Sequence, residues 1–273
     1  DTASESNNRR LLGRALGELA IICELQGKMD DALSHYEQAL AIHREVHNQL
    51  QEGIVLANMG IMYRIQGRGE ESKRHYEAAL KIHQRIGNRR AEGVALCNLA
   101  NLLQQEGQIE QAMKSFCDSL VIFRETGNRR DETLVLGNLG DLYLEAGQLS
   151  EAREHLEAAV TVSRELGLKR AEGAFLGSLG EVCSRLGDVD EARARLDSGE
   201  MLLREVEDKV ELGSLLCRRG HLELGLGNVE EATSRVGEAT DLAAQVSAGS
   251  ESILGKKISR LNKAIGAASG VST

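Results

Sequence analysis

The sequence of 273 residues contains no proline and no tryptophan, and aromatic residues make up only 3% of it. Without proline, no position lacks a backbone N–H or breaks a helix by a steric clash, so helices can form throughout the chain. Chain reversals are then left to glycine, of which there are 29. Apolar residues still make up 41%, which is enough to bury a core and argues against disorder.

Charge and hydropathy exclude several classes of partner. The 42 acidic residues outnumber the 33 Lys and Arg residues, and the net charge of −9 disfavours nucleic acid as a partner. No apolar run is long enough to span a membrane. The opening segment, DTASESNNRR, lacks the apolar stretch of a signal peptide. We therefore expect a cytoplasmic protein with no nucleic-acid and no membrane partner.

The cysteines are odd in number and form no C-x-x-C pair, and all of them fall within helical patterns. These features favour small buried residues in a reducing compartment over a metal site or a catalytic thiol. The five are Cys23, Cys97, Cys117, Cys183 and Cys217.

A 40-residue repeat runs through the chain without an insertion. GNRRAEGVALCNLA (87–100) is followed 40 residues later by GNRRDETLVLGNLG (127–140). Glycine, leucine and small residues recur in fixed columns. Three of these columns are Gly27, Gly67, Gly107, Gly147, Gly187, Gly227; Leu16, Leu56, Leu96, Leu136, Leu176, Leu216; and Ala20, Gly60, Ala100, Gly140, Gly180, Gly220. Six copies at a fixed period predict a solenoid.

Each repeat reads as two amphipathic helices. In the second repeat, apolar residues recur at helical spacing on either side of Gly67, which interrupts the pattern. Small residues at Gly60 and Ser72 would let the two backbones approach closely, with Tyr63 and Tyr76 filling the space around them. The segment GNRRAEG is then the joint between one helix pair and the next.

These motifs resemble the tetratricopeptide repeat (TPR), whose pattern is W-x2-L-G-x2-Y…A-x3-F. Residues 56–76 read L-x2-M-G-x2-Y…S-x3-Y, and the resemblance covers about residues 9–247. The period is 40 rather than 34, and the usual proline is missing. The longer period is similar to that of LGN/Pins polarity adaptors and of TPR arrays in bacterial signalling proteins. The resemblance implies an all-α, right-handed superhelical solenoid of six TPR-like helix pairs plus a C-terminal capping helix.

The predicted boundaries follow the repeat. We expect a tail at residues 1–8, a capping helix at 251–266 and a second tail at 267–273; the six repeats would occupy residues 9–48, 49–88, 89–128, 129–168, 169–208 and 209–247. A basic helix on a membrane surface is the alternative for the capping helix. The chain starts at a joint, so we expect an array cut from, or starting within, a larger protein, with a natural terminus as the alternative.

No catalytic or cofactor motif is present: there is no P-loop, no G-x-S-x-G and no H-E-x-x-H. The histidines recur by register, which favours copied structure over a ligand set. We therefore expect no enzyme, no cofactor and no metal site.

An asparagine column, formed by Asn58, Asn98 and Asn138, recurs in the first helices. Ser178 and Arg218 continue the column. Helix propensity does not explain three asparagines at this position. The TPR resemblance places the column on a concave groove, where it implies that the amides grip the backbone of an extended peptide. An amide suits this because it both donates and accepts a hydrogen bond. A structural bond to the neighbouring helix pair is the alternative.

The resemblance places further polar residues on the same groove. They are Asn101, Asp141, Glu181, Arg64, Gln104 and Glu145. The carboxylates gather in the C-terminal half, so a partner segment carrying Lys or Arg is expected there. The positions at which other TPR domains hold lysines for acidic chaperone tails contain none, and such a tail is not expected. These positions are Ala57, Cys97, Gly137, Gly177 and Cys217.

Two sets of charges remain. The joints carry arginine and lysine beside Glu92, Glu132 and Glu172; local ion pairs are favoured over a basic ridge along the groove. In the last two repeats, charges stand in core columns. We predict that Arg219 pairs with Glu200 or Glu223, the alternative being that this junction is a docking surface.

The sequence as a whole favours a non-enzymatic scaffold that holds a protein or peptide segment. The alternative is a regulatory or sensor array from a larger signalling protein, acting on its missing domain or on another copy of itself. Because one fold hosts many ligands, the sequence does not name the partner.

Overall fold

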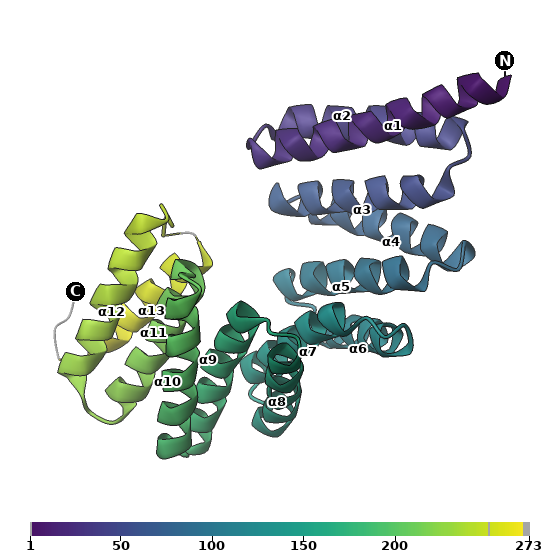
Figure 1. The fold of residues 1–273 in the computed structure, drawn as a ribbon. Helices are drawn as coiled ribbons and strands as arrows, with labels where there is room; N and C mark the ends of the chain where they lie inside the picture. Colours follow the sequence, from purple (N-terminus) through teal and green to yellow (C-terminus); the bar gives the residue numbers. More distant parts are fainter. Residues whose placement is uncertain (1, 251, 270–273) are drawn as a thin grey trace. The chain divides into compact units, whose positions relative to one another are not determined.

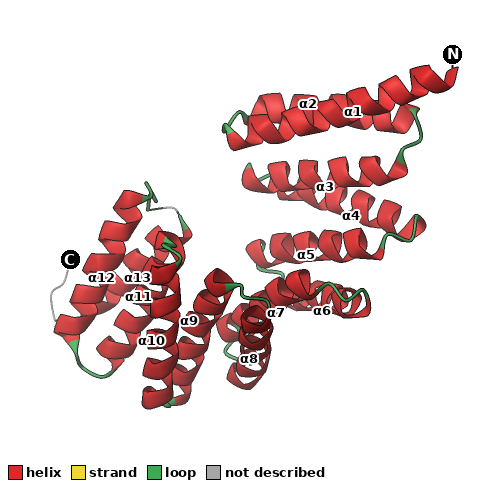
Figure 2. Ribbon diagram, viewed as in Figure 1, coloured by secondary structure: helices red, strands yellow, loops and turns green. Residues whose placement is uncertain are grey.

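The computed structural model describes residues 2–250 and 252–269, and over this part of the chain it contains thirteen α-helices and no strand (Figures 1 and 2). The helices are α1 Thr2–Leu25, α2 Met29–Glu45, α3 Gln49–Ile65, α4 Gly69–Arg85, α5 Arg89–Gln105, α6 Ile109–Glu125, α7 Arg129–Glu145, α8 Leu149–Glu165, α9 Lys169–Leu186, α10 Val189–Glu205, α11 Lys209–Gly225, α12 Val229–Gln245 and α13 Ile253–Ala268. The chain divides into two compact units, one ending at Val135 and the other beginning at Leu136. The predicted all-α architecture of helix pairs with a final helix is confirmed.

One turn recurs every 20 residues and sets the helix length. The helices from α2 to α8 have 17 residues each, and a residue with positive φ follows each of them. At Gly67, for example, the amide N–H of Arg68 donates to the carbonyl of Tyr63 at 2.8 Å, which closes the end of α3. The sequence revealed this turn at the end of the first helices, but second helices end in the same way, at Gly87 and Gly127 among others.

The small-residue columns bring paired helices close together, as predicted. Ser72 of α4 donates from Oγ to the carbonyl of Gly60 in α3 at 2.8 Å. A Cβ added to Gly60 would lie 2.6 Å from Cε1 of Tyr76, so any side chain there would push the helices apart. In the second unit, a Cβ added to Gly180 would likewise lie only 2.7 Å from Cγ of Leu196.

A core column runs along the second helices. These helices bury one large side chain per repeat at 40-residue intervals: Tyr36, Tyr76, Phe116, Leu156, Leu196 and Val236. The first unit has a core cluster of α1–α4 side chains, and the second has one that includes α13. Burial of these side chains, rather than intrinsic helix propensity, accounts for most of the stability of such helices.

The two ends differ from the predicted tails. Helix α1 begins at Thr2, so the described residues of segment 1–8 are helical, and the prediction of a loose tail is wrong for them. At the other end, Ser252 caps α13, and Leu254 and Leu261 pack on Gly213 and Gly220 of α11. Of the predicted tail 267–273, residues 267 and 268 belong to α13, whereas 270–273 lie outside the described residues. Among the described helices, none is long and apolar enough to cross a bilayer.

Candidate functional site

The asparagine column lies on the odd-numbered helices. We call the surface that carries it the first-helix face and treat it separately in each unit. All three asparagines are half-buried. Asn58 of α3 and Asn98 of α5 belong to the first unit and Asn138 of α7 to the second.

Asn58 lines a cavity of about 350 Å³ between α1, α2 and α3. Arg14 and Glu18 of α1 and the buried Tyr36 and His43 of α2 also line it. Burial and the Glu24 carboxylate raise the pKa of Tyr36 well above its usual value, while the Asn58 amide, which contacts the hydroxyl, opposes them. Asn58 therefore has a structural contact with the preceding helix pair in addition to its place at the cavity.

Asn98 and Asn138 lack such a contact. Within the described residues, neither amide has a hydrogen-bond partner in the protein. Because both are half-buried and helical backbone groups are already paired, these amides are available to water or to a ligand. A structural contact with the neighbouring helix pair therefore accounts for Asn58 but not for Asn98 and Asn138.

The next positions on the first-helix face make polar contacts of their own. Arg64 of α3 donates from Nη1 to Oε1 of Gln105 on α5 at 3.4 Å. Asn101 lies 3.8 Å, Nδ2 to Sγ, from Cys97 one turn earlier on α5. Gln104 is half-buried on α5, and Glu145 is exposed at the end of α7. Arg64 therefore links α3 to α5, and Gln104 and Glu145 each take part in a further polar interaction.

In the second unit, arginines form ion pairs with two of the predicted groove carboxylates. Nε of Arg218 donates to Oε2 of Glu181 at 3.1 Å, and its Nη2 lies 3.8 Å from Oδ1 of Asp141. Arg185 donates to Oε1 of Glu181 at 2.5 Å. Burial alone would raise the pKa of Glu181, but Arg218 and Arg185 outweigh it and hold the pKa below the usual glutamate value. Of the predicted carboxylates, Glu181 is therefore neutralised by its own neighbours, whereas Oδ1 of Asp141 accepts no hydrogen bond from the described residues.

A second cavity, of about 470 Å³, lies between α9, α11 and α13. We call it the α9–α11–α13 cavity. Its charged lining consists of Glu181, Arg185, Arg218, Lys257 and Arg260, with His221, Ser184 and Cys217 as the remaining contacts. The repeat pattern does not predict this concentration of cations, because Lys257 and Arg260 lie on the capping helix, outside the repeat columns.

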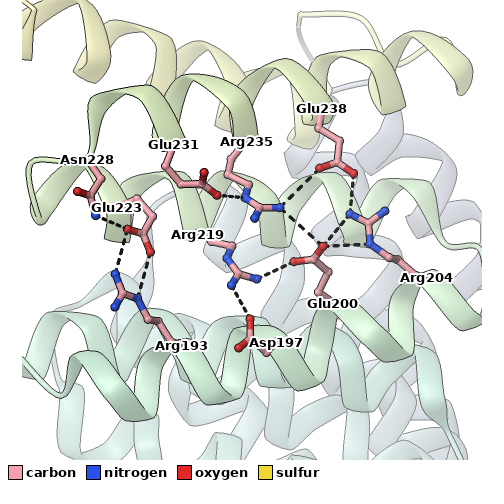
Figure 3. A network of polar contacts seen from close by, with 10 residues as sticks. All are labelled: Arg193, Asp197, Glu200, Arg204, Arg219, Glu223, Asn228, Glu231, Arg235 and Glu238. Atoms are coloured by element: carbon pink, nitrogen blue, oxygen red, sulfur yellow. Dashed lines mark hydrogen bonds and ion pairs between the residues drawn. The ribbon is translucent and has the colours of Figure 1, made fainter.

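The charges in the core columns form an ion-pair network across α10, α11 and α12 (Figure 3). Arg219 donates to Oε2 of Glu200 at 2.7 Å and to Asp197 at 2.5 Å, which confirms the predicted pairing with Glu200. Glu223 instead accepts from Arg193 at 3.1 Å and from Asn228 at 2.7 Å. Arg204, Glu231, Arg235 and Glu238 complete the network.

Local ion pairs also account for the charges at the joints. Arg89 binds Glu92 at 2.8 Å and Glu125 at 2.5 Å, and Arg164 binds Glu172 at 2.8 Å. The arginine side chains remain about half exposed, so each pair contributes little to stability. The favoured reading of the joints, local pairs rather than a ligand-binding ridge, fits these contacts.

The cysteines follow the structural reading with one exception. All five are free thiols, and Cys23, Cys183 and Cys217 are buried, whereas Cys117 is exposed and departs from the expectation. Burial raises the pKa of Cys217 to about 11, against the opposing effect of Lys257 and Arg218, so the thiol stays protonated at neutral pH. Among the described residues, no three His, Cys, Asp or Glu side chains come together as a metal site would need.

Comparison with known proteins assigns the sequence to a family. The sequence model of the MalT-like TPR region matches residues 13–212. No curated protein sequence matches the chain. No protein named in these comparisons is an LGN/Pins adaptor, so that finer resemblance stays a prediction.

Solved structures share the fold at low identity. A signal transduction ATPase with numerous domains (STAND) and a tetratricopeptide repeat sensor, from Pyrococcus horikoshii, is 18% identical, with a TM-score of 0.74 over 97% of this chain; the chain spans only 41% of that protein. The apo form of RapI is 17% identical, with a TM-score of 0.72 over 95% of this chain and 99% of RapI. A Rap protein complexed with Competence and Sporulation Factor is 16% identical, with a TM-score of 0.64 over 93% of this chain and 75% of that one.

Proposed function

Because this chain belongs to the family of MalT-like TPR regions, we propose that it is a non-enzymatic scaffold that binds a peptide segment of a protein partner along its first-helix face. In the first unit Asn98 holds peptide backbone with Asn58 beside it, and in the second unit Asn138 does so; further polar residues of the same face contribute in each unit. Those residues are Arg64, Asn101, Gln104, Asp141, Glu145 and Glu181. A cytoplasmic location is part of the proposal.

The observation that carries this proposal is the state of Asn98 and Asn138. A half-buried amide without a protein partner is costly unless water or a ligand bonds to it. Both amides stand at the register at which Asn58 lines a cavity, and helix propensity gives no reason to keep them. Among proteins of the same fold, one was solved with Competence and Sporulation Factor bound, so an array of this kind can hold a separate molecule.

The test compares affinity capture by the wild type and by an Asn98→Ala/Asn138→Ala variant, followed by calorimetric titration of the purified partner. We expect the variant to lose about tenfold or more in affinity, since each amide makes two backbone hydrogen bonds worth about 0.5–1.5 kcal/mol each. Helicity and thermal stability should not change, because neither amide bonds within the protein.

The matched control is Asn262→Ala, an exposed asparagine on α13. Asn58→Ala is measured separately, because its contact with Tyr36 means that a loss there would mix folding with binding. A partner that binds the double variant as tightly as the wild type would contradict the proposal and leave the column without a binding role.

A sensor array within a larger signalling protein is the second candidate. The Pyrococcus horikoshii structure favours it, because there a tetratricopeptide repeat sensor is joined to a signal transduction ATPase. In that case the partner is a domain of the same polypeptide or a second copy of the chain. Light scattering over a range of protein concentrations tests the second copy: a mass that doubles with concentration supports it, and a constant monomer mass opposes it.

A further inference from the structure

The α9–α11–α13 cavity has more positive charge than its carboxylates neutralise. Four of its lining residues are basic: Arg185, Arg218, Lys257 and Arg260. Only one lining residue, Glu181, is acidic. Glu181 binds both Arg185 and Arg218, and Asp141 lies near Arg218 from the side of α7. Glu211 of α11 is a third carboxylate near Lys257, so three carboxylates face four cations.

The unmatched charge belongs to the capping helix. Within the described residues, neither Lys257 nor Arg260 has a hydrogen bond or ion pair with an acidic side chain. Burial lowers the pKa of Lys257, and the nearby Arg218 lowers it further, against Asp141, Glu211 and Glu181. An amine whose charged form is disfavoured in this way gains free energy when an anion approaches it.

The neutral groups of the cavity also suit an anion. Burial lowers the pKa of His221, with Arg260 and Arg185 adding to the effect against Glu181, so the imidazole is neutral at pH 7 and has one N–H to donate. Ser184 adds a hydroxyl donor. Arg218 is only 12% exposed in its side chain, and a partly desolvated guanidinium binds a carboxylate more strongly than one in open water.

We propose that the α9–α11–α13 cavity binds a carboxylate of the partner peptide, through Lys257 and Arg260 of α13 and Arg218 of α11. The carboxylate is an Asp or Glu side chain or the peptide's C-terminus. This proposal rests on the peptide-binding function above and gives the bound segment one chemical feature. It also departs from the expectation that the C-terminal part of the groove selects Lys or Arg, because Arg218 and Arg185 already pair with Glu181, one of the carboxylates that would bind such a ligand.

The experiment uses the whole chain and short fluorescent peptides of equal length, measured by fluorescence anisotropy. Three have amidated C-termini and alternate alanine with glutamate, glutamine or lysine; a fourth is the glutamine peptide with a free C-terminal carboxylate. We expect the glutamate peptide to bind about tenfold more tightly than the amidated glutamine and lysine peptides. Binding of the fourth peptide, but not of its amidated form, would assign the site to a C-terminus.

Variants locate the binding. Lys257→Gln should weaken the glutamate peptide about fivefold, as expected for one partly exposed charged contact. The matched control is Lys263→Gln, which removes the same charge from an exposed position of the same helix and should leave affinity nearly unchanged. Glu181→Gln removes a competing carboxylate from the cavity and should strengthen binding.

Equal affinity for all the peptides, including no binding of any, would overturn the proposal, as would equal losses in Lys257→Gln and Lys263→Gln. Should Lys257→Gln fail to fold, NMR of the arginine Nε–H groups in the wild type decides: Arg218 and Arg260 signals must shift with the glutamate peptide and stay in place with the glutamine peptide.

The two proposals fail separately. If the Asn98→Ala/Asn138→Ala variant loses its partner while glutamate and glutamine peptides bind alike, the scaffold function stands and the carboxylate site falls. If the glutamate peptide depends on Lys257 while partner capture ignores Asn98 and Asn138, the carboxylate site stands and the asparagine-based function falls.

Discussion

Nη1 of Arg219 donates to Oε2 of Glu200 at 2.7 Å, although leucine is the commonest residue at each of the two positions in the other repeats. The two side chains are only 16% and 14% exposed. Removing one partner of such a pair costs more than replacing both with apolar side chains. We expect Glu200→Leu to lower the free energy of unfolding by about 2 kcal/mol, because Arg219 would keep only Asp197.

The Arg219→Leu/Glu200→Leu double variant should return to within about 1 kcal/mol of the wild type, since it restores the repeat pattern. Urea denaturation of the wild type, both single variants and the double variant completes the thermodynamic cycle. Single losses that simply add in the double variant would mean that the two residues are not energetically coupled.

A second prediction concerns two helical glycines in opposite surroundings. Gly180→Ala would place a Cβ 2.7 Å from Cγ of Leu196 and 3.2 Å from the carbonyl oxygen of Ala192, so α9 and α10 must separate. We expect a loss of about 1–3 kcal/mol. Gly237→Ala on α12 meets nothing within 4 Å and should stabilise by about 0.5–1 kcal/mol, because alanine favours the helix. Urea midpoints measure both, and a stabilising Gly180→Ala would disprove the close approach.

A third prediction concerns pH. His43 is fully buried, with no partner for either ring nitrogen, and burial lowers its pKa against the opposing effect of Glu52. In the unfolded chain the histidine pKa is about 6.5, so the unfolded state binds a proton at a pH at which folded His43 stays neutral. The contribution of this residue is therefore fully present above about pH 6.5 and is lost as the pH falls below it.

His43→Phe should remove that acid-side loss. A phenyl ring fits there, because Phe123 packs over Gly93 in the way that His43 packs over Gly13. Urea midpoints at about pH 7.5 and pH 5.5 give the comparison. The control is His47→Asn, which removes an exposed histidine from a positive-φ turn that asparagine tolerates. If His43→Phe and the wild type weaken equally in acid, His43 is not the group responsible.

A fourth prediction concerns the recurring turn. Glu207 has a φ of 53° at a position where most turns have glycine. We expect Glu207→Gly to stabilise by about 1 kcal/mol by relieving the left-handed strain. Gly187→Ala, at a φ of 87°, should destabilise by a similar amount for the same reason. Thermal melting of both variants measures the pair, and shifts of the same sign would contradict the explanation.

The sequence predicted the fold well because its signals are local and repeated. Gly67 marks a turn and Gly60 a close approach, and each recurs at a period that leaves one architecture. The extent of α1 was missed because residues 2–8 lack the apolar periodicity that identified the other helices. The glycine signal of the turn is absent at His47 and Glu207, although the predicted repeat boundaries fall next to these residues.

The candidate site was only partly predictable. Register alone placed Asn58, Asn98 and Asn138, but it could not show that only Asn58 contacts Tyr36. The charge of the second unit's groove depends on Arg218 reaching back to Glu181, 37 residues earlier, and on Lys257 of a helix outside the repeat. Contacts between helices at such separations do not follow from the pattern of any single helix.

Matching caps have a consequence for how the array can evolve. Asn48 accepts from the backbone N–H of Gln51, and Asn88 accepts from that of Ala91 in the same way. Excision of residues 49–88 would therefore join Asn48 to Arg89 and recreate an intact helix start. A deletion in register with the 40-residue repeat would thus remove a whole helix pair and keep a capping asparagine at the new joint. The number of helix pairs could therefore change by one without leaving a helix start uncapped at that joint.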